Sequence, residues 1–374
     1  MPVFCTLDPR FIDCLKFCYA VGTYLFLHMR SRKPHVAVVF GGDSPNRDLS
    51  AETGYWACQY IPRNRYQVTP VQVTAAGHWQ VPLGSLPVSG SVRPVLRELF
   101  RAVPAVPPAD GLARLLGRQV DVLFTVLRGR GGDDGTMHAL GTLLGIPVAG
   151  PTPSACHETC NKATCAERLR DVISSPAAIR AGADADVLVE EVRASFVPPL
   201  FIKPAVSEGS AGIEEVTTFD ELSAAISRAK SIDSALVQPR SRGQEVAVSV
   251  FRGPRGKVHV LPPTVIVPRQ ARYYDHMAKR RGGRVSLLTS RPEKNELLNE
   301  VEDIAHEVFT ELGGEGLLTL DLAIGPKSTE LLEVNSVPTA TELTPLLHQL
   351  RAGGTSPAHL LDTLLARALE RGPL

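Results

Sequence analysis

The chain has 374 residues, enough for two or three domains with a sizeable core. Hydrophobic residues make up 44% and charged residues 21%, as in ordinary soluble proteins, and a formal net charge of +1 gives no general reason to expect nucleic acid or an anionic membrane as a partner. The seven cysteines form no regular framework, which favours free thiols in a reducing cytoplasm over disulfides.

The first 28 residues are unlike the rest. Residues 17–27 are apolar, but this run is too short to span a bilayer, and it lacks the basic flank and the cleavage site of a signal peptide. Two interpretations stay open. Residues 1–28 are either an extension ahead of a folded body that begins near Met29, or a short helix that docks on the first domain.

The next part of the chain alternates apolar runs with helix-like stretches, which is typical of an α/β architecture. Residues 36–40 are a continuous apolar run followed by two glycines, as in a buried parallel strand that enters a loop. Further strands are predicted at 120–127, ahead of a glycine-rich acidic segment, and at 146–150. Residues 88–108 are proline-rich and indicate a surface connection around one helix.

The pattern changes after residue 153. The predicted elements there are a helix containing Asn161 and Lys162, a strand at 200–204, a small loop at 206–212 and a helix at 220–229. Beyond Val237 the predicted elements are strands at 245–251 and 259–267, a basic irregular stretch at 269–284, a helix at 293–312, a hairpin and a closing helix.

The hairpin, from Leu317 to Asn335, carries chemistry on one face. Its turn lies at residues 325–328, and pairing around this turn places Asp321 opposite Glu333, with Asn335 on the same face. Four residues are expected to point the other way, into a core: Leu320, Leu322, Leu332 and Val334. Two carboxylates and an amide oxygen suit Mg²⁺ that carries a nucleotide phosphate. From the hairpin alone, a polar sheet face without metal is an equally good interpretation.

A second group of potential metal ligands is the cluster of Cys156, His157, Cys160 and Cys165. Its spacing does not match the usual paired-ligand patterns, and Cys156 and Cys160 fall on one face of a helix. The sequence therefore disfavours a zinc site here.

Eight segments, taken in order, resemble the D-alanine–D-alanine ligase family of the ATP-grasp enzymes, from about His35 to the C-terminus. They are VAVVFGGDSPNRDLS, VLRGRGGDDGTMHALGTLLGIPVAGPT, NKATCAERL, FIKPAVSEGSAGI, LVQPRSRGQEVAV, ARYYDHMAK, LLTLDLAIG and LLEVNSVP. The resemblance implies an α/β (α+β) ATP-grasp fold behind an N-terminal Rossmann-like parallel-sheet domain. The implied division is an extension at 1–28, a substrate-binding domain at 29–152, a central ATP-grasp subdomain at 153–238, and a C-terminal subdomain at 239–374 with the metal site and a lid loop.

Such ligases phosphorylate a carboxylate with ATP, and the amine of a second substrate then attacks the acyl phosphate. Because phosphoryl transfer depends mainly on positioning and on neutralising charge, it needs cations, metal ligands and a loop of backbone donors. The resemblance implies ATP and Mg²⁺ (or Mn²⁺) as cofactors, amino-acid substrates, a cytoplasmic homodimer, and neither nucleic acid nor a membrane as partner.

The phosphate-binding positions of the family are retained. Lys162 and Lys203 match its two phosphate-contacting lysines, and the loop at 207–212, with Ser210, is suited to cover phosphates with backbone donors. Lys279 matches the lid lysine that reaches the transferring phosphate. The hairpin residues Asp321, Glu333 and Asn335 match the magnesium ligands. The candidate catalytic residues are Lys203, Lys279, Arg280 and Ser210.

The nucleoside positions are matched with one change. Gln238 stands where the family usually has a glutamate for the adenine amino group, and Val237 would offer backbone groups beside it. Glu245 matches the carboxylate that holds the ribose hydroxyls.

The amino-acid half departs from the family. Asn46 replaces the glutamate that binds the first substrate's ammonium, whereas the nearby Ser50 is retained. Arg128 replaces a histidine, Asp133 and Asp134 stand for a Glu-Asp pair, and Arg280 replaces the tyrosine after the lid lysine.

Two changes lie closest to the chemistry. Thr319 replaces an arginine and Thr339 replaces a glycine, which together stabilise the oxyanion of the tetrahedral intermediate in the family. Losing such a donor costs about a hundredfold or more in rate, unless Arg280 or Arg128 reaches in from another direction. Thr344, or a neighbour, stands for the serine that meets the second substrate's carboxylate.

Three interpretations follow: a D-alanine–D-alanine ligase of unusual sequence, an ATP-grasp ligase that joins other amino-acid-like substrates in specialised metabolism, and a catalytically weak ATP-binding regulatory protein. Retention of the lysines and metal ligands favours an active ligase whose substrates differ from two D-alanines. The basic stretch at 269–284 also allows a nucleic-acid patch, which the near-neutral chain makes a weak alternative.

Overall fold

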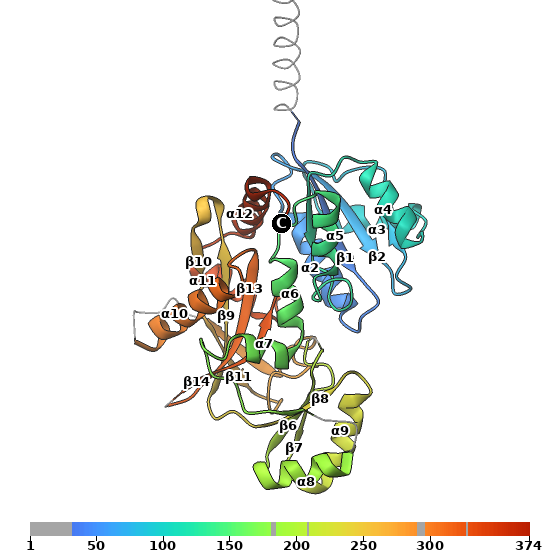
Figure 1. The fold of residues 1–374 in the computed structure, drawn as a ribbon. Helices are drawn as coiled ribbons and strands as arrows, with labels where there is room; N and C mark the ends of the chain where they lie inside the picture. Colours follow the sequence, from blue (N-terminus) through green and yellow to red (C-terminus); the bar gives the residue numbers. More distant parts are fainter. Residues whose placement is uncertain (1–31, 181–184, 208, 290–295, 327) are drawn as a thin grey trace, which may run out of the picture.

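The computed structural model describes residues 32–180, 185–207, 209–289, 296–326 and 328–374. The segment 1–28 and Met29 therefore lie outside the described residues. Figure 1 shows the elements of residues 35–144 at the upper right, those of residues 179–239 at the bottom, and those of residues 244–371 on the left.

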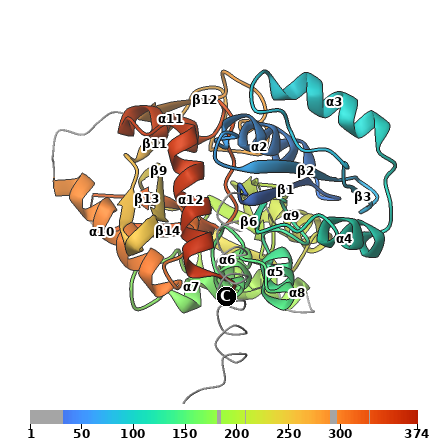
Figure 2. The same cartoon turned by 90° about the horizontal axis from the view of Figure 1, so that it is seen from above.

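The N-terminal sheet has the strand order β3-β2-β1-β4, and β1 pairs in parallel with both β2 and β4. The strands are β1 (His35–Gly41), β2 (Gln67–Val73), β3 (Trp79–Gln80) and β4 (Val122–Thr125), and the helices are α2 (Arg47–Tyr60), α3 (Val92–Ala102), α4 (Pro108–Leu116) and α5 (Thr136–Leu144). Figure 2 shows α2 and α3 on one side of the sheet and α4 and α5 on the other. Every residue of β1 is buried, because helices cover both faces of the sheet. The strand predicted at 146–150 is reduced to one parallel bridge between Leu123 and Val148.

The middle part of the chain forms a small antiparallel sheet with the order β5-β8-β6-β7. Its elements are α6 (Pro153–Cys160), α7 (Lys162–Arg168), β5 (Ile179–Arg180), α8 (Ala185–Ser195), β6 (Leu200–Pro204), β7 (Glu214–Val216), η1 (Phe219–Glu221), α9 (Leu222–Lys230) and β8 (Ala235–Pro239). Ile202 and Val237 pack with Ile226 of α9 in a core on one face of the sheet. The single helix predicted around Asn161 is two helices, because the Asn161 side chain caps α7 by accepting the N–H groups of Ala163 and Thr164.

The C-terminal part is built on an antiparallel sheet with the order β12-β11-β9-β13-β14, to which β10 adds by pairing with β9. Its elements are β9 (Gln244–Arg252), η2 (Pro254–Gly256), β10 (Val258–Val260), β11 (Thr264–Pro268), β12 (Val285–Thr289), α10 (Glu296–Glu311), β13 (Leu317–Ile324), β14 (Thr329–Asn335), α11 (Pro345–Gly353) and α12 (Pro357–Arg371). The single strand predicted at 259–267 is wrong. It breaks into β10 and β11 around Pro262 and Pro263, whose nitrogens cannot donate to a sheet.

The predicted pairing of the β13–β14 hairpin is confirmed, since Asp321 lies opposite Glu333. One detail was wrong. The register shifts at Asp321 and Leu322 so that Leu322 lies opposite Leu331, and this β-bulge brings Leu331 into the core and leaves Leu332 on the cavity side. Leu320, Leu322 and Val334 enter the core as expected, against α10.

The described part of the chain contains no helix with the length and apolar character needed to cross a bilayer.

Candidate active site

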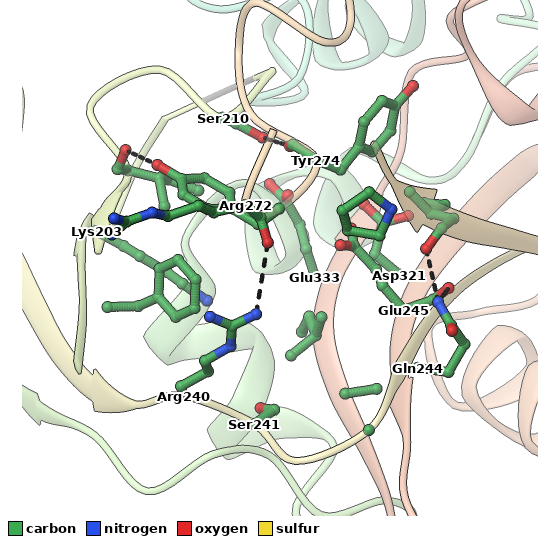
Figure 3. Close-up of a pocket in the computed structure, with 18 of the residues that line it drawn as sticks. Lys203, Ser210, Arg240, Ser241, Gln244, Glu245, Arg272, Tyr274, Asp321 and Glu333 are labelled. Carbon is green, nitrogen blue, oxygen red and sulfur yellow. Dashed lines mark hydrogen bonds between the residues drawn. The ribbon is translucent and has the colours of Figure 1, made fainter. Parts of the chain in front are cut away.

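A cavity of about 280 Å³ lies between the small sheet and the C-terminal sheet. Figure 3 shows Lys203 and Arg240 reaching it from the side of the small sheet, and Glu245 and Asp321 from the C-terminal sheet. Seven of the residues predicted from sequence line this cavity together: Lys162, Lys203, Ser210, Glu245, Lys279, Asp321 and Glu333.

Lys203 reaches the cavity because β6 alternates its side chains. Leu200 and Ile202 point into the core of the small sheet, so Phe201 and Lys203 share the opposite face. Burial lowers the pKa of Lys203 to about 8, and the nearby Lys162 adds to this shift. The site therefore concentrates positive charge that an anionic ligand would relieve.

Lys162, the first residue of α7, joins two walls of the cavity. Its Nζ donates to the Ser207 carbonyl oxygen at 2.9 Å and lies 3.2 Å from Glu333 Oε1. One ammonium thus fixes the position of Ser207 relative to the hairpin.

Three buried carboxylates crowd the opposite wall. Burial raises the pKa of Asp321 to about 7 although Lys279 opposes the shift, and Glu333 and Glu245 raise it further. Burial also raises the pKa of Glu245, against the effect of Lys279. For Glu333 burial acts in the same direction, but Lys162 and Lys279 outweigh it, and its pKa is lowered. A cation between Asp321 and Glu333 would neutralise this excess negative charge.

The hairpin residues fit Mg²⁺ together with phosphate oxygens. No group of three or more His, Cys, Asp or Glu side chains in the described ranges is placed to hold a metal without help. Mg²⁺ commonly takes one or two carboxylates and completes its shell with substrate phosphates. Asn335 donates through Nδ2 to Asp321 (3.3 Å) and accepts at Oδ1 from Arg128 (3.3 Å), so its amide must rotate to offer the oxygen to a cation.

The cysteine cluster has a different character. Among the described residues, Cys156, Cys160 and Cys165 form no disulfide, and burial raises the pKa of both Cys156 and Cys165 to about 12. Metal binding requires the thiolate, which these environments disfavour.

The two residues predicted to hold adenine do not line the cavity. Val237 lies in the core of the small sheet, and Gln238 donates to the Pro176 carbonyl oxygen at 3.4 Å; neither belongs to the cavity wall. The wall is formed instead by apolar side chains suited to a flat base, and sequence reasoning missed them: Phe201, Ile266 and Leu332. Strand alternation from Lys203 was the signal that would have identified Phe201.

The basic stretch at 269–284, which the resemblance predicts to be a lid, contributes Arg272, Tyr273, Tyr274 and Lys279 to the cavity wall. Ser210 Oγ donates to the Tyr274 carbonyl oxygen (3.0 Å), and His276 Nδ1 lies 3.0 Å from the Gly209 carbonyl oxygen. Arg280 Nη2 donates to Asn46 Oδ1 at 2.6 Å and to the Pro45 carbonyl oxygen at 3.0 Å. The lid thus contacts both the 207–212 loop and the N-terminal end of α2, and neither Arg280 nor Asn46 lines the cavities.

A smaller cavity of about 50 Å³ adjoins the first on the far side of Asp321. It brings together four of the residues predicted to meet the amino-acid substrates, namely Arg128, Thr319, Thr339 and Thr344. Lys279 and Asp321 line both cavities.

Two other predicted substrate residues lie elsewhere. Ser50 is fully buried, donates to the Val126 carbonyl oxygen (2.6 Å) and accepts the Gly41 N–H (2.9 Å), so it joins the ends of β1 and β4. Asp133 lines a third cavity, of about 200 Å³, and forms a buried ion pair with Arg128 at 3.2 Å.

Comparison with known proteins places these features in a family. A family model for the D-Ala–D-Ala ligase N-terminus matches residues 35–151, and one for the C-terminus matches residues 178–366. The D-alanine–D-alanine ligase of Corynebacterium aurimucosum is 32% identical over 356 residues, covering 92% of this chain and all of the relative. That of Clostridium acetobutylicum is 27% identical over 348 residues, covering 91% of this chain and 99% of the relative.

Solved structures show the same fold. The VanG D-Ala:D-Ser ligase from Enterococcus faecalis aligns with a TM-score of 0.73 at 22% identity, over 90% of this chain and all of the other. The D-alanine–D-alanine ligase from Bacillus anthracis, solved in complex with ATP, aligns with a TM-score of 0.66 at 20% identity, over 90% of this chain and 98% of the other. The predicted ATP-grasp fold is confirmed. The chain belongs to the D-alanine–D-alanine ligase family of ATP-dependent, peptide-bond-forming ligases.

Proposed function

We propose that this chain transfers the γ-phosphoryl group of ATP to a substrate carboxylate, releases ADP, and joins the acyl group to the amine of a second substrate. The observation that carries the proposal is the arrangement of Asp321 and Glu333 across one cavity from Lys203. Phosphoryl transfer requires such a pairing of metal ligands with phosphate-binding cations, since catalysis is mainly positioning and charge neutralisation.

Different residues of the cavity are proposed to bind the phosphates, the ribose and the metal ion. Lys162, Lys203 and Lys279 hold phosphate oxygens, and the 207–212 loop covers them with backbone N–H groups. Glu245 accepts hydrogen bonds from the ribose. Asp321, Glu333 and Asn335 would hold Mg²⁺, or Mn²⁺, which would neutralise charge on the phosphates when bound.

The substrates of this reaction are amino-acid-like, and we propose that they differ from two D-alanines. Thr319 cannot carry a charge, and its hydroxyl is 2.9 Å from that of Ser249. Asn46 is uncharged, and its Oδ1 accepts from Arg280 rather than facing the small cavity. The contacts that would bind a second D-alanine, or the free ammonium group of the first substrate, are therefore altered.

The proposal is tested by measuring ADP release with Mg²⁺-ATP across a panel of D- and L-amino acids, singly and in pairs, with products identified by mass spectrometry. The matched control is Glu333→Gln, which should release little ADP with any substrate. ADP release with D-alanine alone would contradict the proposal that the substrates differ from two D-alanines. Binding of ATP without ADP release from any substrate would instead favour a regulatory ATP-binding protein.

We also propose that the chain acts in the cytoplasm as a homodimer, as the family resemblance implies, and that it serves peptidoglycan-type precursor synthesis or a specialised pathway. Light scattering of the purified chain tests the dimer.

A further inference from the structure

Amide formation on an acyl phosphate places negative charge on the acyl oxygen, and this charge needs a fixed donor. The inference that follows rests on the proposed ligase function. Thr319 lines the small cavity but offers only a hydroxyl that is already bonded to Ser249. A cationic donor to this oxygen must therefore come from another residue around this cavity.

Two cationic side chains line the small cavity within the described residues, Arg128 and Lys279. Lys279 lies on the nucleotide side. It also lines the larger cavity, its Nζ is 4.8 Å from the Tyr274 ring centroid, and it interacts with the carboxylates of Glu245 and Asp321. Its position suits the phosphoryl group rather than the acyl oxygen.

Arg280, the other arginine considered from sequence, is committed elsewhere. Its guanidinium donates to Asn46 Oδ1 and to the carbonyl oxygens of Pro45 and His276. These contacts hold it between the lid and α2, outside the walls of the small cavity.

Arg128 comes from the N-terminal part of the chain and lines the small cavity but not the larger one. Its Nη1 donates to the Val337 carbonyl oxygen at 2.7 Å and lies 3.2 Å from Asp133 Oδ1, and its Nη2 donates to Asn335 Oδ1 at 3.3 Å. Asp133 is itself fixed by the Gly129 N–H at 2.6 Å. Three of the five N–H donors of the guanidinium are used by these bonds, so donor capacity remains.

The anchoring makes Arg128 a preorganised donor. The residue is only 5% exposed, and its bonds to the Val337 carbonyl oxygen and to Asp133 remain when the Asn335 amide turns toward a cation, so little conformational freedom is left to lose when a substrate binds. It also shares the small cavity with Thr319, Asp321 and Asn335. An acyl phosphate with its phosphoryl group toward Lys279 and Asp321 would turn its acyl end toward Arg128.

We propose that Arg128 is a catalytic residue that stabilises the acyl oxygen during amide formation, in place of a cation at position 319. In this step the amine nitrogen bonds to the acyl carbon, and the carbonyl π electrons move onto the oxygen that Arg128 faces. They return as the bond from the acyl carbon to the phosphate oxygen breaks. Phosphate leaves with that electron pair and takes the proton that the nitrogen loses, which gives the amide and inorganic phosphate.

The test is a single-turnover quench-flow experiment that measures ADP and ligated product in the same samples, with the substrate pair that the parent chain uses. In Arg128→Met, ADP formation should stay within about threefold of the parent, whereas amide formation should fall about a hundredfold. Adding Thr319→Arg to that variant should recover at least about tenfold of the lost rate, because it returns a cation to the same cavity. Arg114, which is exposed on α4 and lines none of these three cavities, provides the control, since Arg114→Met should leave both rates unchanged.

Each other outcome has a defined meaning. If Arg128→Met slows ADP and amide formation equally, Arg128 acts in binding or phosphoryl transfer and the proposal is wrong; unchanged amide formation also overturns it. If Arg128→Met does not fold, Arg128→Lys is the second variant, because it keeps a positive charge but lacks the fixed N–H donors of the guanidinium. It should still slow amide formation more than ADP formation. A parent chain that forms no ADP with any carboxylate contradicts the proposed function itself, which is a separate result.

Discussion

Lys162 Nζ lies 3.2 Å from Glu333 Oε1, and this ion pair connects the first turn of α7 to the last strand of the central hairpin. Both side chains are largely buried, with 6% and 15% of their surface exposed. The pair therefore fixes the cation proposed to bind phosphate relative to the carboxylate proposed to bind metal, before any ligand is bound.

The pair should be energetically coupled. Lys162→Met leaves a buried carboxylate beside Asp321 without its cation and should lower the free energy of unfolding by about 3 kcal/mol. Adding Glu333→Gln removes the unpaired charge, so the double variant should be more stable than Lys162→Met alone. Urea denaturation of the parent, both single variants and the double variant measures the coupling. Lys257→Met, on the surface, is the control, and additive effects at positions 162 and 333 would show that the pair is not coupled.

Gly209 should be required for the closed arrangement of the loop. Its φ is +54°, and a Cβ there would lie 2.8 Å from Asn46 Oδ1. Gly209→Ala should therefore lower kcat about tenfold or more, since it combines backbone strain with a clash at the loop's contact with α2.

Gly77→Ala is the matched control for this loop, because Gly77 has a φ of +75° with nothing within 4 Å of the added Cβ. It shares the backbone strain but lies far from the site. Steady-state kinetics should separate the two variants, and equal activities would mean that the contact with Asn46 is unimportant.

Nucleotide binding should take up protons at mildly alkaline pH. The pKa of Lys203 is lowered to about 8 by burial and by Lys162, so at pH 8 about half of the free protein carries a neutral lysine. Phosphate favours the charged form and raises this pKa again, so proton uptake on binding Mg²⁺-ATP should grow from pH 7 to pH 8.5. Calorimetry in buffers with different ionisation enthalpies measures the uptake.

Lys203→Met should abolish that proton uptake while weakening binding. The same proton uptake in Lys203→Met as in the parent would assign it to another group.

The lid should be protected by nucleotide. Six basic residues between Arg269 and Arg284 offer trypsin sites, and the lid reaches the 207–212 loop through Tyr274 and His276. Mg²⁺-ATP should slow cleavage in this stretch because phosphates bind beneath it, whereas AMP, which lacks the β- and γ-phosphates, should protect less. Protection by nucleic acid but not by ATP would show that the stretch is a nucleic-acid surface.

The hairpin could be predicted well from sequence, because its Gly-Pro turn fixes the centre of pairing and strand alternation does the rest. That is why Asp321 and Glu333 are opposite one another as expected. The β-bulge could not be predicted, since an unpaired residue leaves no distinct pattern in an apolar run. As a result Leu332 lies at the cavity and Leu331 in the core.

Contacts between distant parts of the chain also could not be predicted from the sequence. Arg128 bonds to Val337, which is 209 positions away, and nothing local in either segment indicates that contact. Gln238 lies in β8 and Ser50 in α2, but their polar groups bond to backbone oxygens of other segments instead of facing a cavity. Sequence periodicity gives the face of a strand, whereas side-chain partners depend on how the domains pack.

The central claim is that the cavity between the two sheets activates a carboxylate as an acyl phosphate. The most direct measurement uses a substrate whose carboxylate carries ¹⁸O, incubated with Mg²⁺-ATP and the second substrate, followed by mass spectrometry of the released phosphate. The account predicts that ADP is released and that inorganic phosphate contains one ¹⁸O atom from the carboxylate. Unlabelled phosphate, or release of AMP in place of ADP, would contradict it.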